Sequence, residues 1–158
     1  MFREVARKKQ SLSKEEMIQI LRQEKRGVLS LHGENGYPYG LPINYYYNEE
    51  NGCIYFHSGK KGHRTDALKK DSRVCYCVYD KGTPKEGHWS LNVKSVIVFG
   101  RIELTEDLGI ITKICAPLSR KFTSDEEYIS RELSESAKNT LILKLTPEHV
   151  TGKLVNEA

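Results

Sequence analysis

A basic segment without acidic residues is the first candidate for chemistry. It joins the predicted end of a strand to the predicted start of a short helix, and its sequence is His57-Ser58-Gly59-Lys60-Lys61-Gly62-His63-Arg64. The two glycines let backbone N–H groups approach a ligand, and the helix N-terminus adds a partial positive charge to the charges of Lys60, Lys61 and Arg64. These features predict an anion site that suits a phosphate. The alternative is a solvated basic loop, since lysine and glycine are ordinary loop residues.

A tyrosine-rich strand around residues 41–47 is the second candidate. Period-two alternation places Pro42 and Asn44 on one side and Tyr45 on the other, and neither side is plainly polar, so both are expected to be covered. Pro42 cannot donate to a strand ladder, which indicates an edge, a bulge or a docking place. An aromatic stripe of this kind fits the core or a dimer interface better than a cofactor platform.

A third candidate is Ser95, which forms a polar pair with Lys94 directly before the apolar run Val96-Ile97-Val98-Phe99-Gly100. A serine in such a strand needs a hydrogen-bond partner if it is buried, and the alternative is that it faces solvent. No residue is assigned a catalytic role. The candidates for proton transfer, by residue type alone, are His57, His63, Tyr45 and Tyr46.

The cysteines do not indicate a metal site. Cys75 and Cys77 bracket a single residue, which is not the spacing of zinc ligands. In a strand these two side chains point to the same face, which is poor geometry for a disulfide and predicts two small core residues. We therefore expect reduced thiols and a cytoplasmic protein.

The composition is that of a globular chain, and we expect one domain over residues 1–158. Hydrophobic residues at 38% and charged residues at 29% exclude a disordered chain, and a net charge of +4 is too small for a dedicated nucleic-acid binder. No apolar run reaches the roughly 20 residues of a membrane helix, and the N-terminus lacks the apolar stretch of a signal peptide. The glycine-rich phosphate loops and the serine elbow of common enzyme families are also absent.

Apolar periodicity predicts a mixed α+β chain. A helix is expected over 14–23, because Ser13 and Glu16 can form a capping box. Strands are expected over 27–32, 37–47, 54–57, 74–79, 89–104, 140–145 and 149–154, and further helices over 63–70, 106–118 and 125–134. Asn-Gly connectors between the first three strands indicate hairpins. The expected fold is an antiparallel barrel of about six strands with helices at its margins.

Taken in order, these segments resemble the flavin-binding split-barrel superfamily, in the branch that is related to pyridoxamine 5'-phosphate oxidase and includes Nim-type nitroimidazole-resistance proteins. The resemblance covers nearly the whole chain and rests on Gly36-Tyr37-Pro38-Tyr39 to Asn44-Tyr45, Ile54-Tyr55-Phe56-His57-Ser58, Gly62-His63 to Leu68, the Ser95 to Gly100 run and Pro147-Glu148-His149-Val150-Thr151-Gly152-Lys153. Each motif is short, and the specificity lies in their order. The resemblance implies a six-stranded antiparallel split barrel that forms a homodimer and holds flavin mononucleotide (FMN) in grooves between the subunits.

The resemblance also implies four groups of cofactor-binding residues. They are the flavin-lining Pro42, Asn44 and Tyr45, the strand-end pair His57 and Ser58, the phosphate-binding Lys61, Gly62, His63 and Arg64, and the ring-flanking Ser95 and Val96. It thereby favours a phosphate site over a solvated loop in the basic segment.

The sequence departs from the pyridoxamine phosphate oxidases at its end. The chain stops five residues after Lys153, without the arginine-bearing segment that those oxidases use for the substrate phosphate and for their dimer. We therefore expect a Nim-like protein that passes electrons from NADH or NADPH through FMN to a small acceptor, such as a nitroaromatic compound. The alternatives are a non-catalytic flavin-binding or flavin-storage protein and a split-barrel protein that handles haem or a deazaflavin.

Overall fold

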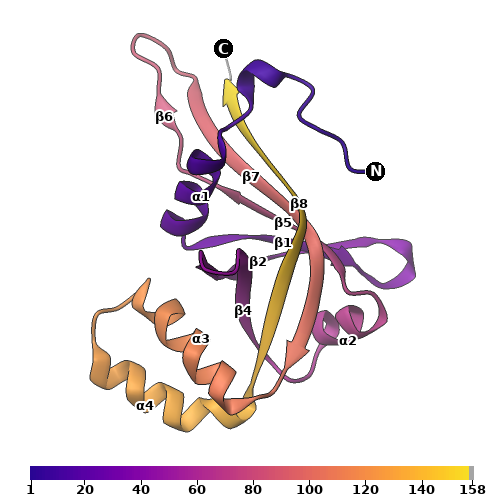
Figure 1. Cartoon of the computed structure of the whole chain (residues 1–158), viewed down its shortest axis with the longest axis vertical. Helices are drawn as coiled ribbons and strands as arrows, with labels where there is room; N and C mark the ends of the chain where they lie inside the picture. Colours follow the sequence, from indigo (N-terminus) through magenta and orange to yellow (C-terminus); the bar gives the residue numbers. More distant parts are fainter. Residues whose placement is uncertain (157–158) are drawn as a thin grey trace.

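The structure is a computed structural model, which describes residues 1–156. The strands of this part form one antiparallel sheet in the order β2-β1-β5-β7-β8-β4-β3, and β6 pairs with β7 beside this path. Figure 1 shows that the sheet is strongly curled. The strands are β1 (Arg26–His32), β2 (Pro38–Asn44), β3 (Tyr46–Asn48), β4 (Cys53–Gly59), β5 (Arg73–Tyr79), β6 (Thr83–Pro84), β7 (Leu91–Thr105) and β8 (Thr140–Asn156).

The helices lie at the margins of the sheet. They are α1 (Lys14–Gln23), α2 (His63–Lys70), α3 (Leu108–Arg120) and α4 (Glu126–Ser136), with the 3-10 turns η1 (Lys8–Gln10), η2 (Glu34–Gly36) and η3 (Ala137–Asn139). The predicted capping box is present, because the Ser13 hydroxyl accepts from the Glu16 N–H and the Glu16 carboxylate accepts from the Ser13 N–H. α1 and α2 have the predicted bounds, and α3 and α4 each end two residues later than predicted.

A single residue connects the two ends of the sheet. β2 and β3 are the first and last strands of the sheet order, and only Tyr45 lies between them in the chain. The Tyr45 side chain is fully buried, and its carbonyl oxygen accepts a hydrogen bond of 3.2 Å from Lys121 Nζ at the end of α3. The prediction of one strand over 37–47 is therefore wrong at Tyr45, where the chain passes from one edge of the sheet to the other and closes the barrel.

β8 is one long strand where two were predicted. The predicted break between residues 145 and 149 is wrong, because β7 pairs with β8 on both sides of it. Only the register shifts there: Phe99 pairs with His149 and Gly100 with Pro147, so that Glu148 is left out of the pairing. A bulge of this kind tolerates proline, since the ladder is already interrupted. The α+β class and the antiparallel sheet are confirmed, whereas the count of six strands is wrong because of the division at Tyr45, the short β6 and the continuous β8.

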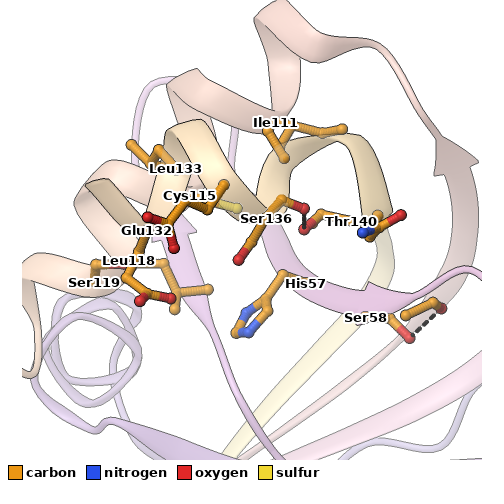
Figure 2. A pocket seen from close by; sticks show the side chains of 14 residues that line it. His57, Ser58, Ile111, Cys115, Leu118, Ser119, Glu132, Leu133, Ser136 and Thr140 are labelled. Atoms are coloured by element: carbon orange, nitrogen blue, oxygen red, sulfur yellow. Dashed lines mark hydrogen bonds between the residues drawn. The ribbon is translucent and has the colours of Figure 1, made fainter. Parts of the chain in front are cut away.

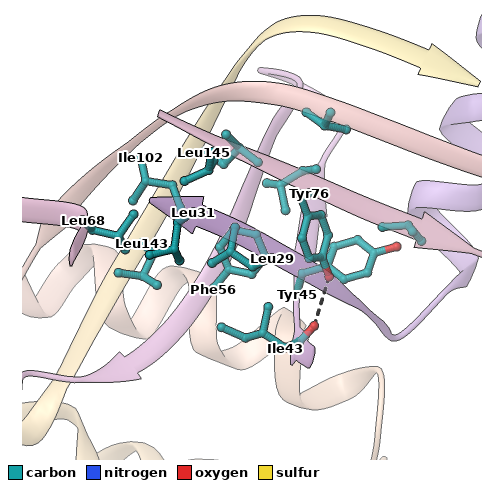
Figure 3. Close-up of a cluster of buried hydrophobic side chains, with 14 of the residues drawn as sticks. Leu29, Leu31, Ile43, Tyr45, Phe56, Leu68, Tyr76, Ile102, Leu143 and Leu145 are labelled. Carbon is teal, nitrogen blue, oxygen red and sulfur yellow. Dashed lines mark hydrogen bonds between the residues drawn. The ribbon is translucent and has the colours of Figure 1, made fainter. Parts of the chain in front are cut away.

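The inward-facing side chains of the sheet form the main core (Figure 3). The Tyr76 ring packs edge-on against Tyr45 and Phe56, with ring centroids 5.3 and 4.8 Å apart. Its hydroxyl donates a hydrogen bond of 3.0 Å to the Ile43 carbonyl oxygen, which joins β5 to β2 across the barrel. Buried hydroxyls need such a partner, so this bond lets a tyrosine fill the core without an unpaired polar group.

A second cluster of buried residues lies on the outer side of the sheet. It joins Tyr55 of β4 and Ile142 of β8 to Ile111, Ile114 and Cys115 of α3. Figure 1 shows α3 and α4 side by side on one flank of β4 and β8, with α2 on the opposite flank. The end of β4 therefore lies between α3 and α4 on one side and α2 on the other.

Cys75 and Cys77 share one face of β5, as predicted, but this is the outer face and not the core. Their side chains are half-buried and alternate with the fully buried Tyr76 and Val78. Burial raises the pKa of both thiols. All four cysteines are free.

Within residues 1–156, no helix has the length and apolar character needed to cross a membrane.

Candidate cofactor site

Two neighbouring side chains at the end of β4 point to opposite sides of the sheet. Ser58 is buried and contacts Arg64 of α2, whereas His57 is exposed and faces α3 and α4. Successive side chains of a strand alternate in this way. We call residues 59–64, on the Ser58 side, the basic turn, and the cavity on the His57 side the helical pocket.

Arg64, the last residue of the basic turn, is half-buried in the first turn of α2. Its guanidinium donates a hydrogen bond to the Ser58 hydroxyl, which in turn donates to the Gly59 carbonyl at 2.9 Å. Arg64 Nε is buried without a hydrogen-bond partner, and no carboxylate of the described residues pairs with this side chain. Burial lowers the pKa of Arg64. A desolvated guanidinium with a free N–H is costly unless a counter-charge meets it, so this position suits an anion.

The start of α2 has no side-chain cap, unlike the other three α-helices of the described chain. Ser13, Asp107 and Asp125 each accept a backbone N–H at the start of α1, α3 and α4. The N-cap of α2 is Gly62, at φ 126° and ψ 171°, a conformation that essentially only glycine adopts. A Cβ at Gly62 would meet nothing within 4 Å. The free N–H groups of the first turn are therefore open to a ligand.

The two lysines of the basic turn differ in their partners. Lys60 Nζ forms an ion pair of 2.8 Å with Glu106. Lys61 is exposed, and no residue in the described part of the chain pairs with it. Lys61 can therefore turn toward an anion without giving up a partner, whereas Lys60 cannot.

Two side chains that the sequence analysis missed hold the basic turn in place. Tyr39 of β2 stacks on His63, with ring centroids 4.3 Å apart and 16° between the planes. Thr65 is almost fully buried, and its hydroxyl donates to the Gly59 carbonyl at 3.4 Å. Tyr39 acts by ring stacking and Thr65 by a neutral hydrogen bond, so a sequence pattern of charged residues does not indicate either of them. Only the Gly36–Tyr39 motif of the family resemblance pointed to Tyr39.

Two of the other predicted residues, Pro42 and Asn44, lie in β2, and two, Tyr45 and Val96, point into the barrel. Pro42 is exposed on the outer face, and Asn44 Oδ1 accepts a hydrogen bond of 2.7 Å from Arg26 Nε. Tyr45 and Val96 are fully buried in the barrel core. Their side chains cannot reach a surface ligand, so at these two positions only the backbone is available for a contact.

Ser95 and the basic turn lie near opposite ends of β8. Ser95 is half-buried on the outer face of β7, pairs with Lys153 and donates a hydrogen bond of 3.5 Å to the Lys153 carbonyl. Gly59 pairs with Thr140 at the other end of β8. From Thr140 to Lys153 the path along the curled strand is roughly 40 Å, at about 3.3 Å per residue. The structure therefore brings Ser58, Lys61, Gly62, His63 and Arg64 together. His57 lies at the same strand end but faces the helical pocket, and Ser95 lies apart from both.

The helical pocket opens on the other side of β4. Figure 2 shows His57 of β4 pointing into a space that Leu118 of α3 and Glu132 of α4 also border. The atoms packed around the ring, and then the positive charge of Arg64, lower the pKa of His57. Apart from His57 and Ser58 this lining was not predicted, because its residues come from separate segments that only packing brings together.

The donors of the basic turn fit the phosphate end of a flavin nucleotide. Arg64 offers an unpaired N–H, the uncapped start of α2 offers backbone N–H groups, and Lys61 offers a free ammonium. All three are hydrogen-bond donors with positive charge or partial charge, and phosphate oxygens are acceptors. Within residues 1–156, no three His, Cys, Asp or Glu side chains come together as metal ligands do.

Comparisons with known proteins identify the family and the fold. A family model described as pyridoxamine 5'-phosphate oxidase matches residues 13–154, whereas a search of curated proteins finds no match. Similar solved structures include a candidate 5-nitroimidazole antibiotic resistance protein from Bacteroides thetaiotaomicron, with a TM-score of 0.79 and 21% identity over 92% of this chain and 87% of that chain. An FAD-binding protein from Mesorhizobium loti has a TM-score of 0.65 and 23% identity over 92% and 96%. An FAD and heme binding protein from Mycobacterium smegmatis has a TM-score of 0.69 and 20% identity over 95% and 74%. At these identities the likeness shows the fold.

Proposed function

This chain belongs to the pyridoxamine 5'-phosphate oxidase family of split-barrel proteins, and from that membership we propose that it binds FMN and passes electrons from NADH or NADPH to a small acceptor such as a nitroaromatic compound. One observation carries the proposal: the buried and unpaired Nε of Arg64 beside the uncapped start of α2. Two of the similar structures are described as FAD-binding, which supports a flavin cofactor.

The basic turn favours FMN over other flavins. Its donors converge on one short turn, which matches a single terminal phosphate rather than a longer diphosphate. Arg64 and Lys61 would give charge-assisted hydrogen bonds to that phosphate, and the N–H groups of His63 and Arg64 would give two more. Riboflavin has no phosphate, so it should lose these contacts and bind more weakly.

The separation of Ser95 from the basic turn supports a homodimer. The two regions lie at opposite ends of β8, so a flavin that contacts both is most simply shared by two copies of the chain, each contributing one region. Of the tyrosines expected in the core or at a dimer interface, Tyr45 is fully buried and Tyr46 and Tyr47 are half-buried, whereas Ser95 lies half-buried on the outer face of β7. We therefore place the interface on the outer face of β1, β5 and β7. There the half-buried Val28, Cys77 and Ile97 form one cross-strand row.

The residues of this chain would bind and orient the cofactor. When bound, FMN would accept a hydride from the nicotinamide and deliver electrons to the acceptor. The basic turn would hold the phosphate end. His57, with its lowered pKa, is neutral near pH 7 and can hydrogen-bond without adding charge. Burial removes Tyr45 from the candidates for proton transfer, which leaves His57, His63 and Tyr46.

The absorption spectrum of the purified full chain, with mass spectrometry of the released ligand, tests the cofactor. The proposal expects a flavin band and the mass of FMN. FAD, haem or a deazaflavin as the released ligand would overturn it. Steady-state oxidation of NADH or NADPH with a nitroaromatic acceptor then tests catalysis, since a flavin-storage protein would give no turnover. Light scattering should return twice the 18.1 kDa mass of one chain, and a monomer at micromolar concentration would contradict the shared site.

A further inference from the structure

The helical pocket is a cavity of about 420 Å³ between the end of β4 and helices α3 and α4. This volume lies within the range of small-molecule sites, about 300 to 1,000 Å³. The pocket is lined by His57, Ser58, Gly59, Ile111, Cys115, Leu118, Ser119, Glu132, Leu133, Glu135, Ser136, Ala137, Asn139 and Thr140. The basic turn and the helical pocket share only Gly59, at the end of β4.

The inner wall of the pocket is apolar. Ile111, Cys115 and Leu118 of α3 are buried, and Leu133 of α4 packs with the same cluster. Burial raises the pKa of the Cys115 thiol to about 11, so this sulfur is a neutral apolar surface near pH 7. A ligand here would therefore bury a hydrocarbon or aromatic body against α3.

The formal charges of the lining are all negative. Glu132 and Glu135 of α4 line the pocket, and no Lys or Arg does, although the chain as a whole has a net charge of +4. Neither carboxylate forms an ion pair or hydrogen bond in the described part of the chain, whereas Glu126 of the same helix is paired with Arg120 at 2.7 Å. Glu132 and Glu135 are thus available to a cation.

The nearby basic side chains do not pair with Glu132 or Glu135. Arg131 of α4 lies over the Tyr128 ring, with its guanidinium carbon 5.6 Å from the centroid. Lys121 Nζ is held by the carbonyl oxygens of Glu24 and Tyr45. Lys138 on η3 is exposed and is not part of the lining. The carboxylates therefore face the pocket without a competing base among its lining residues.

We propose that the helical pocket is a second small-molecule site, which binds an organic cation with an apolar body. The body lies against Ile111, Cys115 and Leu118, and the ammonium or amidinium group meets Glu132 and Glu135 at the mouth. The His57 ring borders the bound molecule from β4. The site stands apart from the proposed phosphate site and does not require flavin, so it goes beyond the proposed function.

Titration calorimetry on the full chain as purified tests this site with three probes of one size: benzylamine, benzyl alcohol and benzoate. The variant is Glu132→Gln with Glu135→Gln, which keeps shape and removes charge. The matched control is Glu127→Gln, an exposed glutamate of α4 outside the pocket lining. Because all three side chains are exposed, circular dichroism should show each variant folded.

In the wild-type protein, benzylamine should bind about tenfold more tightly than benzyl alcohol, since two carboxylates near one ammonium contribute that much at a partly exposed site. Benzoate should not bind measurably. The double Gln variant should lose the preference for the amine, and Glu127→Gln should keep it. Absence of benzylamine binding, equal binding of the amine in the double variant, or binding of benzoate as tight as the amine would each overturn the proposal. FMN binding at the basic turn should be unchanged in all of these variants, so failure of either site is distinguishable from failure of the other.

Discussion

The two sides of β4 differ in charge although they begin at adjacent residues. On the Ser58 side, Arg64, Lys61 and the uncapped start of α2 collect positive charge without a counter-ion. On the His57 side, Glu132 and Glu135 collect negative charge without a base. Strand alternation is enough to separate them, because residue i and residue i+1 face opposite sides of a sheet. One strand end therefore presents unpaired positive charge on one side of the sheet and unpaired negative charge on the other.

The largest effect should come from removing the charge of the basic turn. Lys61→Ala with Arg64→Ala should weaken FMN binding about 100-fold or more, because two charge-assisted hydrogen bonds to phosphate are lost. Riboflavin affinity should change little. Fluorescence titration of both ligands measures the difference.

The control for this variant is Lys69→Ala with Lys70→Ala, which removes the same charge at the far end of α2. It should leave FMN affinity nearly unchanged. If the control loses as much FMN affinity as the test variant, the lysines and Arg64 act only through the overall positive charge of the protein. The contrast between the two sides of β4 would then not arise from contacts at the basic turn.

The next-largest effect, on the free energy of unfolding, should come from the backbone conformation of Gly62, the N-cap residue of α2. Gly62→Ala should lower the free energy of unfolding by about 2 kcal/mol, because alanine is strained at the φ of 126° that Gly62 adopts. Gly59→Ala is the matched control, since a Cβ at Gly59 also meets nothing within 4 Å but no positive φ is required. Urea denaturation of both variants measures this. Equal losses would show that the turn is not held in the glycine-specific conformation.

A smaller effect on the free energy of unfolding should come from Lys121, which joins the end of α3 to the barrel. Burial lowers the pKa of Lys121 from 10.5 to about 8. Between these two pH values the unfolded chain keeps a proton that the folded protein has lost, so rising pH favours the folded state through this residue. Relative to Lys121→Met, the wild-type stability should gain about 1 kcal/mol from pH 8 to pH 10, the value being reduced by solvent screening of a half-exposed group.

The comparison with Lys121→Met is needed because other groups act in the opposite sense. Burial raises the pKa of Tyr45 and Tyr76, which disfavours the folded state at high pH in both proteins. Denaturation curves at several pH values give the difference. No pH-dependent difference would show that the hydrogen bonds of Lys121 to two carbonyl oxygens keep its ammonium charged.

The smallest effect should come from the distant Ser95. Ser95→Ala should weaken FMN binding about fivefold, the loss of one hydrogen bond, if a second subunit brings this residue to the flavin. Ser30→Ala, half-buried on the outer face of β1, is the control. Wild-type affinity in Ser95→Ala would restrict the site to the end of β4 and would remove the argument for a shared flavin.

Local patterns in the sequence predicted the elements near the basic turn, and long-range packing decided the rest. Ser13 and Glu16 fixed the start of α1, and the change from strand to helix around Gly62 placed α2 with its correct bounds. Tyr45 and Val96 were expected at a cofactor but lie in the core. Alternation does not tell the inside of a curled sheet from the outside when both faces are apolar.

The bulge at Pro147 and the helical pocket had no local signal. Proline in a sequence reads as a break, and only the β7–β8 register shows that β8 continues through it. Glu132 and Cys115 line the same pocket as His57 because α3 and α4 pack beside β4, although these residues are far apart in the chain. Such convergence depends on tertiary contacts and not on the spacing of residues.

Titration of FMN and riboflavin into the flavin-free wild-type protein shows whether the basic turn binds a phosphate. FMN should bind about 100-fold more tightly than riboflavin, and the ratio should fall as salt is added, because charge-assisted contacts are screened. Equal affinity for the two flavins, unchanged by salt, would contradict phosphate binding by the basic turn.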